Sequence, residues 1–313
     1  MSALAELRTL RRPGGRHERT RSARKEERAA YLFLLPWILG FLVITAIPML
    51  ASLALSFTDY NLLQAPSWVG LENITRMFHD ARLHHSLWVT FVYVAVSVPL
   101  QLAVALGLAV ALDKGLRGLA FYRSVYYLPS LLGGSAAVAI LWRQMFGADG
   151  LVNQVLQAVG WANPPAWVSD PSTALGSLIV LNVWTFGAPM VIFLAGLRQV
   201  PRMYYEASAV DGATRWRQFR SITVPLLSPI IFFNLVLQII HAFQAFTQAF
   251  IVSGGSGGPS DSTMFFTLYL YQVGFGNFQM GYASALAWLL VLVVAVFTGI
   301  NFYLSKYWVF YDD

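Results

Sequence analysis

Long apolar stretches constrain this chain more than any other feature of its sequence. Residues 31–57 carry no charged side chain over 27 positions, and five further apolar stretches cover residues 86–112, 124–146, 174–197, 222–252 and 283–304. Each of these stretches reaches the roughly 20 residues that a helix needs to cross the hydrocarbon core of a bilayer. The sequence therefore predicts an all-α integral membrane protein with six transmembrane helices between residues 31 and 304.

Composition and missing motifs narrow the class of protein. Hydrophobic residues make up 57% of the 313 positions and charged residues only 12%, which favours a membrane protein over soluble domains. There is no cysteine for a disulfide or thiolate site, and no Gly-Lys dipeptide for a phosphate-binding loop. An HExxH motif is absent too, so the sequence predicts neither an ATPase nor a zinc-dependent hydrolase.

The basic residues follow a membrane topology. Alternate loops between the predicted spans hold 18 and 2 lysines and arginines, with Arg143 left near the outer end of the third span. Under the positive-inside rule, both termini and residues 198–221 are expected in the cytoplasm. Residues 1–30 form a basic cytoplasmic tail and residues 305–313 a short cytoplasmic C-terminus. The net charge of +6 is thus explained without a nucleic-acid partner.

A charged segment interrupts the apolar pattern between residues 205 and 229. It is expected to form two short helices around a turn, with Pro201 at a first helical position, a left-handed residue at Gly212 and a second helix over residues 213–220. Its distinctive positions are Glu206-Ala207-Ser208, Asp211-Gly212-Ala213, Phe219, Ile222, Pro225 and Pro229. This pattern closely resembles the EAA loop of ATP-binding-cassette (ABC) importer permeases, in particular the carbohydrate importers of the maltose and glycerol-3-phosphate type, with Ser208 in place of a second alanine.

The resemblance extends to residues 69–73 and 255–285 and carries several expectations. It implies the type I importer permease fold, a second homologous permease subunit, two ATPase subunits that hold ATP and Mg²⁺, and an extracytoplasmic solute-binding protein. No cofactor or metal is expected in this chain itself. The loop is expected to engage the ATPase, with Glu206 paired to a cation there and Gly212 fitting the turn into a groove. The residues implied in coupling are Glu206, Ala207, Asp211, Gly212, Ala213, Phe219 and Pro225.

Polar side chains inside two of the predicted spans suggest a solute path. Asn234, Gln238, His241, Gln244 and Gln248 recur at intervals of three or four residues, which places them within an arc of about 120° on one helix face. Asn182 precedes Gly187-Ala188-Pro189 in the fourth span, where the helix is expected to break and expose backbone groups to a cavity. Neutral amides and an imidazole suit the hydroxyl groups of a sugar or polyol, although such residues also bond neighbouring membrane helices together.

The hypothesis is therefore a permease subunit of an ATP-driven, binding-protein-dependent sugar importer in the bacterial cytoplasmic membrane. An importer of the same architecture for an amino acid, a polyamine or phosphate is the main alternative. An ion-coupled carrier or channel is the second alternative, and it is disfavoured because no carboxylate lies well inside a predicted span. His79, His84 and His85 lack companion ligands at a usual metal spacing and are expected to be surface residues.

Overall fold

The computed structural model describes residues 21–114 and 118–310, and the elements of this part of the chain are helices joined by loops. Within these residues the sole β-type pairing is an isolated bridge between Thr58 and Trp68. The prediction of an all-α protein is confirmed. Residues 1–20 of the predicted basic tail lie outside the described part.

The chain divides into two units, the first of which ends at Ala54. This unit contains α1 (Arg21–Gly40), the π-helical η2 (Phe41–Ala46) and most of α2 (Ile47–Leu55). Residues Ala29–Leu55 are long and apolar enough to cross a membrane, and no residue of the most apolar part of this stretch is buried within the chain. This span agrees with the one predicted over residues 31–57.

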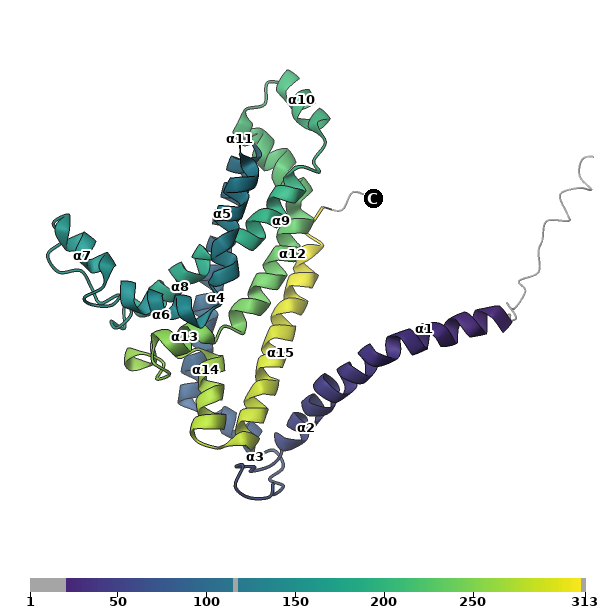
Figure 1. Cartoon of the computed structure of the whole chain (residues 1–313), viewed down its shortest axis with the longest axis vertical. Coiled ribbons are helices and arrows are strands. Elements are labelled where there is room, and N and C mark those ends of the chain that lie inside the picture. Colours follow the sequence, from purple (N-terminus) through teal and green to yellow (C-terminus); the bar gives the residue numbers. More distant parts are fainter. Residues whose placement is uncertain (1–20, 115–117, 311–313) are drawn as a thin grey trace, which may run out of the picture. The chain divides into compact units, whose positions relative to one another are not determined.

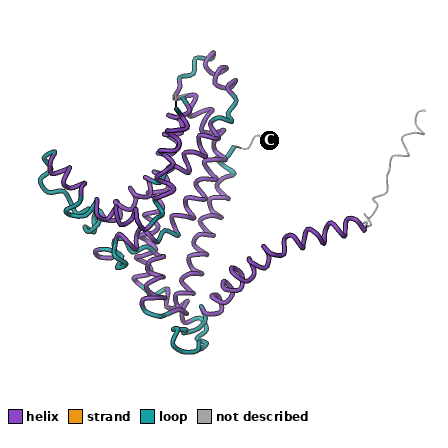
Figure 2. Tube along the Cα trace, in the orientation of Figure 1, coloured by secondary structure: helices purple, strands orange, loops and turns teal. Residues whose placement is uncertain are grey.

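The second unit is a bundle of helices that begins at Leu55 (Figures 1 and 2). Its elements are α3 (Glu72–Met77), α4 (Ala81–Asp113), α5 (Leu119–Leu132), α6 (Ala136–Met145), α7 (Leu151–Ala158), α8 (Ala174–Trp184), α9 (Gly187–Leu197), α10 (Arg202–Val210), α11 (Arg215–Gln218), η3 (Phe219–Thr223), α12 (Val224–Phe243), α13 (Thr247–Val252), η4 (Pro259–Asp261), α14 (Phe266–Tyr271), η5 (Gln272–Gly276) and α15 (Met280–Ser305).

Helix α4 is the central element of this bundle. Its buried residues Val94, Val98, Gln101, Ala105 and Ala109 recur every three or four positions, so they line one face. That side of the helix packs against α8, α9 and α12. Small alanines toward the C-terminal end allow these helices to approach closely.

The apolar helices number between four and six, depending on how two bent pairs are counted. Four helical stretches are long and apolar enough to cross a membrane alone, and two bent pairs pass the same test together. The first pair lies in the span predicted over residues 124–146, where no bend was predicted. Helix α5 ends at Leu132 and α6 leaves it at 94°, with Gly133, Gly134 and Ser135 between them. Ser135 ends the continuity because its side chain caps α6 by accepting a hydrogen bond from Val138 N.

Two other predicted spans are also interrupted. Helices α8 and α9 meet at 42° around Thr185 and Phe186, next to Gly187, and this break was predicted from the Gly-Ala-Pro sequence. The span predicted over residues 222–252 divides into α12 and α13 at residues 244–246, where no glycine or proline signals a break.

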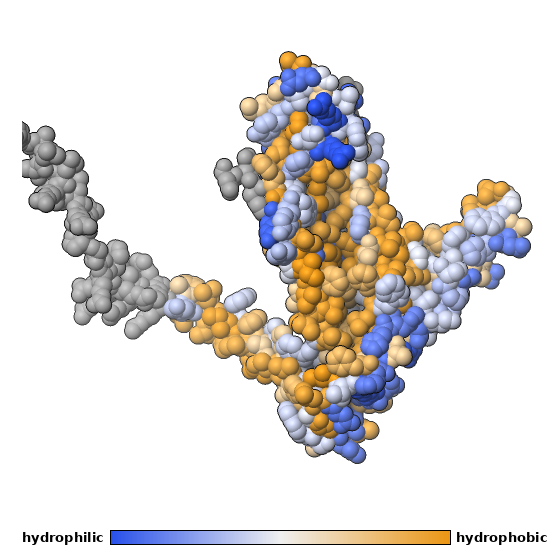
Figure 3. Space-filling model, turned by 180° about the vertical axis from the view of Figure 1, so that it is seen from behind, coloured by the Kyte–Doolittle hydropathy of each residue, from blue (hydrophilic) through white to orange (hydrophobic). Residues whose placement is uncertain are grey.

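The second unit has two ends of different character. Helices α10 and α11 lie at one end, which we call the α10 end, and α3 with the loops around it lies at the other, the α3 end (Figure 1). The flank between them is mainly hydrophobic, while hydrophilic residues gather toward both ends (Figure 3). This distribution is typical of a bundle that is surrounded by lipid between two aqueous phases.

Candidate functional site

The three helix breaks of the second unit converge on one cavity. Its volume is about 390 Å³. The cavity is lined by Tyr93 of α4, by Ser130, Gly133 and Gly134 at the α5–α6 break, by Leu178, Leu181, Asn182 and Thr185 at the α8–α9 break, and by Gln238, His241, Gln244, Ala245, Phe246, Thr247 and Gln248 at the α12–α13 break. Irregular backbone at membrane depth is tolerated where it lines such a cavity.

Side chains from neighbouring helices satisfy the backbone groups that the breaks expose. Gln248 Nε2 donates to Gly133 O at 3.0 Å, and Gln101 Nε2 donates to Thr185 O at 3.2 Å and to Thr185 Oγ1 at 2.9 Å. Ser130 Oγ donates to Thr185 O at 2.8 Å and accepts from Ala188 N at 2.8 Å. These bonds hold the broken ends in place, so the cavity is a built feature of the bundle.

Other polar side chains of the lining remain open to a ligand. Within the described residues, the side chains of Gln238, His241 and Gln244 make no hydrogen bond, and the hydroxyl of Tyr93 makes none. No carboxylate, lysine or arginine lines the cavity. The cavity therefore offers hydrogen-bond donors and acceptors without a fixed charge.

A second site region is the segment that joins α9 to α12. We call residues 202–218 the elbow; they comprise α10, a turn and α11, and η3 joins them to α12. Helix α10 has no buried residue. Gly212 lies in the turn with a φ of +76°, the left-handed conformation that was predicted for it. The second short helix begins at Arg215 rather than Ala213, because Thr214 caps it by accepting a hydrogen bond from Arg217 N.

The residues implied in coupling are spread over the elbow and the start of α12. Glu206, Ala207, Asp211 and Gly212 are exposed, while Ala213, Phe219 and Pro225 are half-buried. Phe219 stacks on Trp216 with ring centroids 5.6 Å apart. Pro225 lies in the first turn of α12, two positions after the end of the π-helical η3, and a π-helical turn relaxes the backbone hydrogen-bond pattern that a proline interrupts.

Hydrogen bonds tie α10 to the residues on both sides of η3. The hydroxyl of Tyr205 pairs with Thr223 Oγ1 at 2.9 Å. Gln218 Nε2 donates to Tyr205 O at 3.1 Å and to Ser208 Oγ at 3.0 Å. The elbow is therefore a defined structure, although most of its surface is exposed.

Charged groups organise the opposite, α3 end. Asp80 caps α4 by accepting from Arg82 N and Leu83 N, and its carboxylate also accepts from the hydroxyls of Tyr269 and Tyr282. Partial burial works to raise the pKa of Asp80, but the hydrogen bonds from both tyrosines and from the backbone outweigh it and hold the pKa below its ordinary value. Arg82 forms a bidentate pair with Asp261 at 2.9 and 3.0 Å.

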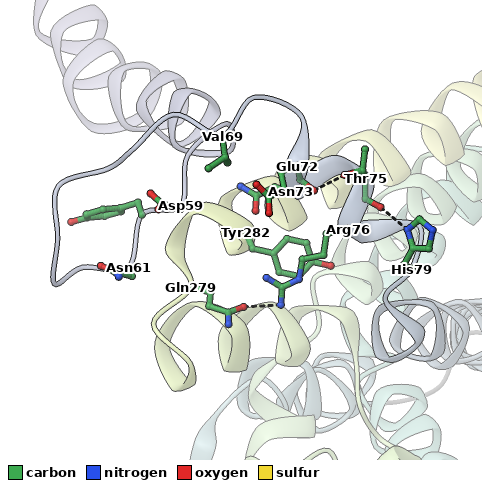
Figure 4. A pocket seen from close by; sticks show the side chains of 11 residues that line it. Asp59, Asn61, Val69, Glu72, Asn73, Thr75, Arg76, His79, Gln279 and Tyr282 are labelled. Carbon is green, nitrogen blue, oxygen red and sulfur yellow. Dashed lines mark hydrogen bonds between the residues drawn. The ribbon is translucent and has the colours of Figure 1, made fainter.

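An open pocket of about 530 Å³ lies beside this network (Figure 4). Arg76 crosses it, with its guanidinium 4.0 Å from the ring centroid of Tyr282 and Nη2 2.8 Å from Gln279 Oε1. His79 lines the pocket and is exposed, and His84 and His85 are exposed as well. Among the described residues no group of three or more potential ligands could hold a metal ion.

Comparison with known proteins identifies the family. The family model described as "Binding-protein-dependent transport system inner membrane component" matches residues 86–308. The chain belongs to this family. It is therefore a multi-pass permease of an ABC transporter, a translocation subunit without catalytic chemistry of its own, and the ATPase is a separate chain.

Two bacterial relatives match nearly the whole permease. The "Probable ABC transporter permease protein YesP" of Bacillus subtilis (strain 168) is 52% identical over 95% of this chain and 96% of its own length. The "Lactose transport system permease protein LacF" of Rhizobium radiobacter is 33% identical, over 88% of this chain and 93% of its own.

A solved structure supports the fold of the permease. A chain from the "Crystal structure of bacterial alginate ABC transporter in complex with alginate pentasaccharide-bound periplasmic protein" superimposes with a TM-score of 0.78. The match covers 92% of this chain and 98% of that one at 21% sequence identity, so it concerns the fold alone.

The structure of the permease separates the polar residues that the sequence had grouped. Gln238, His241, Gln244 and Gln248 line the cavity together with Asn182, whose Nδ2 lies 3.4 Å from Gln101 Oε1. Asn234 does not line it: this residue is buried, and Nδ2 donates to Ile230 O of its own helix. The end of α12 at Phe243 also interrupts the single helix face that was predicted.

Sequence reasoning missed Gln101. This residue is 2% exposed and holds both Thr185 and Asn182, so it positions the α8–α9 break. The sequence did indicate that Gln101 is hydrogen-bonded inside the bundle, because a lone glutamine in an otherwise apolar span has to find a polar partner. Which helix would supply that partner was not readable from the chain.

Proposed function

We propose that this permease carries a neutral carbohydrate, a sugar or related polyol, inward across the bacterial cytoplasmic membrane. The observation that carries the proposal is the uncharged, amide-lined cavity at the meeting point of the three helix breaks. Gln238, His241 and Gln244 offer free donors and acceptors, which suit hydroxyl groups. The neighbouring Phe246 offers an aromatic surface for the apolar face of a sugar ring.

The names of relatives support the same class of solute. A relative named as a lactose permease shares 33% of its residues with this chain over most of both lengths. A charged solute such as an amino acid, a polyamine or phosphate would find no countercharge in the cavity lining. We therefore favour the neutral solute over these alternatives.

The proposed assembly follows from the family and from the elbow. Each bent pair counts as one span, which gives six, and the charge distribution of the loops puts the N-terminus, the elbow and the C-terminus in the cytoplasm. Two ATPase subunits, holding ATP and Mg²⁺, engage the exposed elbow through Glu206 and its neighbours. A second permease completes the path, and an extracytoplasmic binding protein delivers the sugar at the α3 end.

Import then proceeds by alternating access. Closure of the ATPase pair moves the elbow, and the helices around the cavity rearrange so that it opens toward one side of the membrane at a time. The permease supplies the solute path and the elbow that the ATPase pair moves, and it breaks no covalent bond.

Replacing cavity residues tests the proposal. In proteoliposomes that contain the purified complex, we expect Gln244→Leu and His241→Leu to lower sugar uptake at least about fivefold each, because each removes a hydrogen bond of about 1 kcal/mol to the solute. Gln157→Leu is the matched control, since Gln157 is exposed on α7 and does not line the cavity. Uptake that is unchanged in both cavity variants would contradict the proposed site.

A further inference from the structure

The side chains of the elbow attach it to one helix only. Within the described residues, every side-chain hydrogen bond from α10 that leaves this helix runs toward α11 or the end of η3, and none runs to α4 or α9. Tyr205 bonds Thr223, while Gln218 bonds Tyr205 O and Ser208 Oγ. Ser208 Oγ in turn donates to Tyr205 O at 2.9 Å.

These bonds span the weakest point between the elbow and α12. The π-helical η3 covers Phe219–Thr223, with Gln218 directly before it and Thr223 at its end. A π-helical turn is rare and marks a local departure from the regular helical pattern, so an unbraced η3 would let the elbow flex against α12. Bonds to residues on both sides of η3 oppose that flexing.

The elbow also borders the ends of two other helices. A cavity of about 670 Å³ lies where the elbow meets the ends of α4 and α9. It is lined by Val110 and Leu197 of these two helices and by Tyr205, Trp216 and Phe219. The ends of α4 and α9 are joined to each other instead, by an ion pair between Arg198 Nε and Asp113 Oδ1 at 3.6 Å. The elbow has room to move relative to this pair.

Helix α12 leads from η3 directly to the solute cavity. Gln238 and His241 belong to α12, and Gln244 caps its C-terminal end. A displacement of a regular helix at one end is carried along its length, because its backbone hydrogen bonds make it a stiff element.

We infer that Tyr205, Ser208, Gln218 and Thr223 form a clip that makes the elbow and α12 move as one body. This inference rests on the proposed coupling function and adds which helix receives the motion directly, namely α12. Ser208 stands where the EAA pattern has an alanine. The clip explains this difference, because the hydroxyl of Ser208 accepts a hydrogen bond from Gln218 that an alanine could not accept. The four residues are positioning residues, because none of them touches the solute.

The test measures sugar uptake and binding-protein-stimulated ATP hydrolysis in the same proteoliposomes. We expect Gln218→Met to leave ATP hydrolysis within about twofold of wild type while uptake falls about fivefold, and Tyr205→Phe combined with Gln218→Met to lower uptake about tenfold or more. Ser208→Ala, which removes one of the two bonds of Gln218, is expected to have a smaller effect of about twofold. Adding Ser208→Ala to Gln218→Met should change nothing further, because the shared bond is already lost.

Ser221→Ala is the matched control for removal of a hydroxyl. Ser221 lies within η3, is exposed, and its hydroxyl makes no hydrogen bond in the described part of the chain. We expect a wild-type ratio of uptake to ATP hydrolysis for this variant. A normal ratio in the combined Tyr205→Phe/Gln218→Met variant would overturn the clip, and so would a parallel loss of both activities, which indicates damage to the structure alone.

A spectroscopic measurement tests the clip independently of uptake and ATP hydrolysis. The chain has no cysteine, so a nitroxide on Val210→Cys, at a position 89% exposed at the end of α10, reports the elbow alone. We expect the spin-label spectrum of the assembled complex to show greater mobility with Gln218→Met than without it. Unchanged mobility would contradict the clip.

Glu206→Arg separates a failure of the clip from a failure of the coupling function. This change reverses the charge of an exposed residue on α10 and should abolish both uptake and stimulated hydrolysis. If both activities survive Glu206→Arg with the complex assembled, the proposed function itself is wrong. If Glu206→Arg acts as expected and the clip variants keep a normal ratio, only the clip is wrong.

Discussion

The two ends of the second unit are held together in different ways. At the α3 end, charged side chains join segments that are 179 to 203 positions apart in the sequence: Arg82 with Asp261, Asp80 with Tyr282, and Arg76 with Gln279. At the α10 end, the bonds of the elbow are uncharged and join residues 10 to 18 positions apart. The first end is bonded across the bundle, whereas the elbow is bonded only within itself and to Thr223 at the start of α12.

This difference indicates which end is free to move. Charge-assisted bonds are stronger than neutral ones, and bonds between distant segments have to break before those segments can separate. The α3 network links α4, η4, α14 and α15 into one frame. The elbow can be displaced without breaking any comparable link, which is what a segment needs if a partner is to push it.

The largest effect on stability is expected where the backbone is most crowded, at Gly281 in the first turn of α15. Gly281 N donates to Tyr60 O at 2.9 Å, and a Cβ added here would overlap Thr58 O and lie 2.9 Å from the carbonyl carbon of Thr58. We expect Gly281→Ala to lower the stability of the complex by about 3 kcal/mol, because backbone atoms cannot rotate away from the added methyl group. Thermal unfolding of the purified complex measures this change.

Gly299 supplies the control for that substitution on the same helix. A Cβ at Gly299 would meet nothing within 4 Å. Gly299→Ala is expected to be neutral or to stabilise by up to about 1 kcal/mol through helix propensity. Equal effects of the two substitutions would mean that the α3 end is not the rigid frame described above.

Much of the fold was readable from the sequence, because burial in lipid leaves a simple signal. Uncharged stretches of about 20 residues located the spans, and Gly187-Ala188-Pro189 located the α8–α9 break, since these residues disfavour a continuous helix. The left-handed turn at Gly212 was readable for a similar reason, as few other residues adopt that conformation without strain.

The remaining features depend on contacts between distant residues. The 94° bend between α5 and α6 leaves hydropathy unchanged, so the span over residues 124–146 was predicted without it. The α12–α13 break at Gln244 has no local breaker, and Thr267 Oγ1 reaches Ala245 O there from more than 20 positions away. The assembly of Asp80 with Tyr269 and Tyr282 could not be read for the same reason, because only the folded chain brings them together.

Asp80 provides a weaker test of the frame than Gly281. Asp80→Asn keeps a side-chain oxygen for the helix cap but gives the two tyrosine hydroxyls a neutral acceptor in place of a charged one. We expect a loss of about 1.5 kcal/mol at pH 7, since hydrogen bonds to charged groups are stronger than neutral ones and partial exposure screens the charge. Uptake per folded complex should stay near wild type, whereas a selective loss of uptake would assign this network a role in transport.

The stability difference between the wild type and Asp80→Asn should depend on pH with a definite sign. The pKa of Asp80 in the folded state lies below its ordinary value of 3.8, so the ionised carboxylate stabilises the fold. This contribution is fully present above pH 3.8 and is lost as the pH falls through the lowered folded-state pKa. The gap in unfolding temperature between wild type and Asp80→Asn should therefore narrow on acidification below pH 3.8. A gap that stays constant would show that the charge of Asp80 is not what stabilises the frame.

The smallest effect on stability is expected at the α10 end, at Gly212. A Cβ here would meet nothing within 4 Å, so the cost of Gly212→Ala is limited to the left-handed φ of +76°, about 1 kcal/mol. Gly212→Asn should recover most of that loss, because asparagine tolerates this conformation. Uptake is a more informative measurement here than stability. If both variants unfold near the wild-type temperature and both lose uptake, a partner occupies the space next to Gly212 in the working complex. Normal uptake in both would mean that the partner does not approach the elbow at this turn.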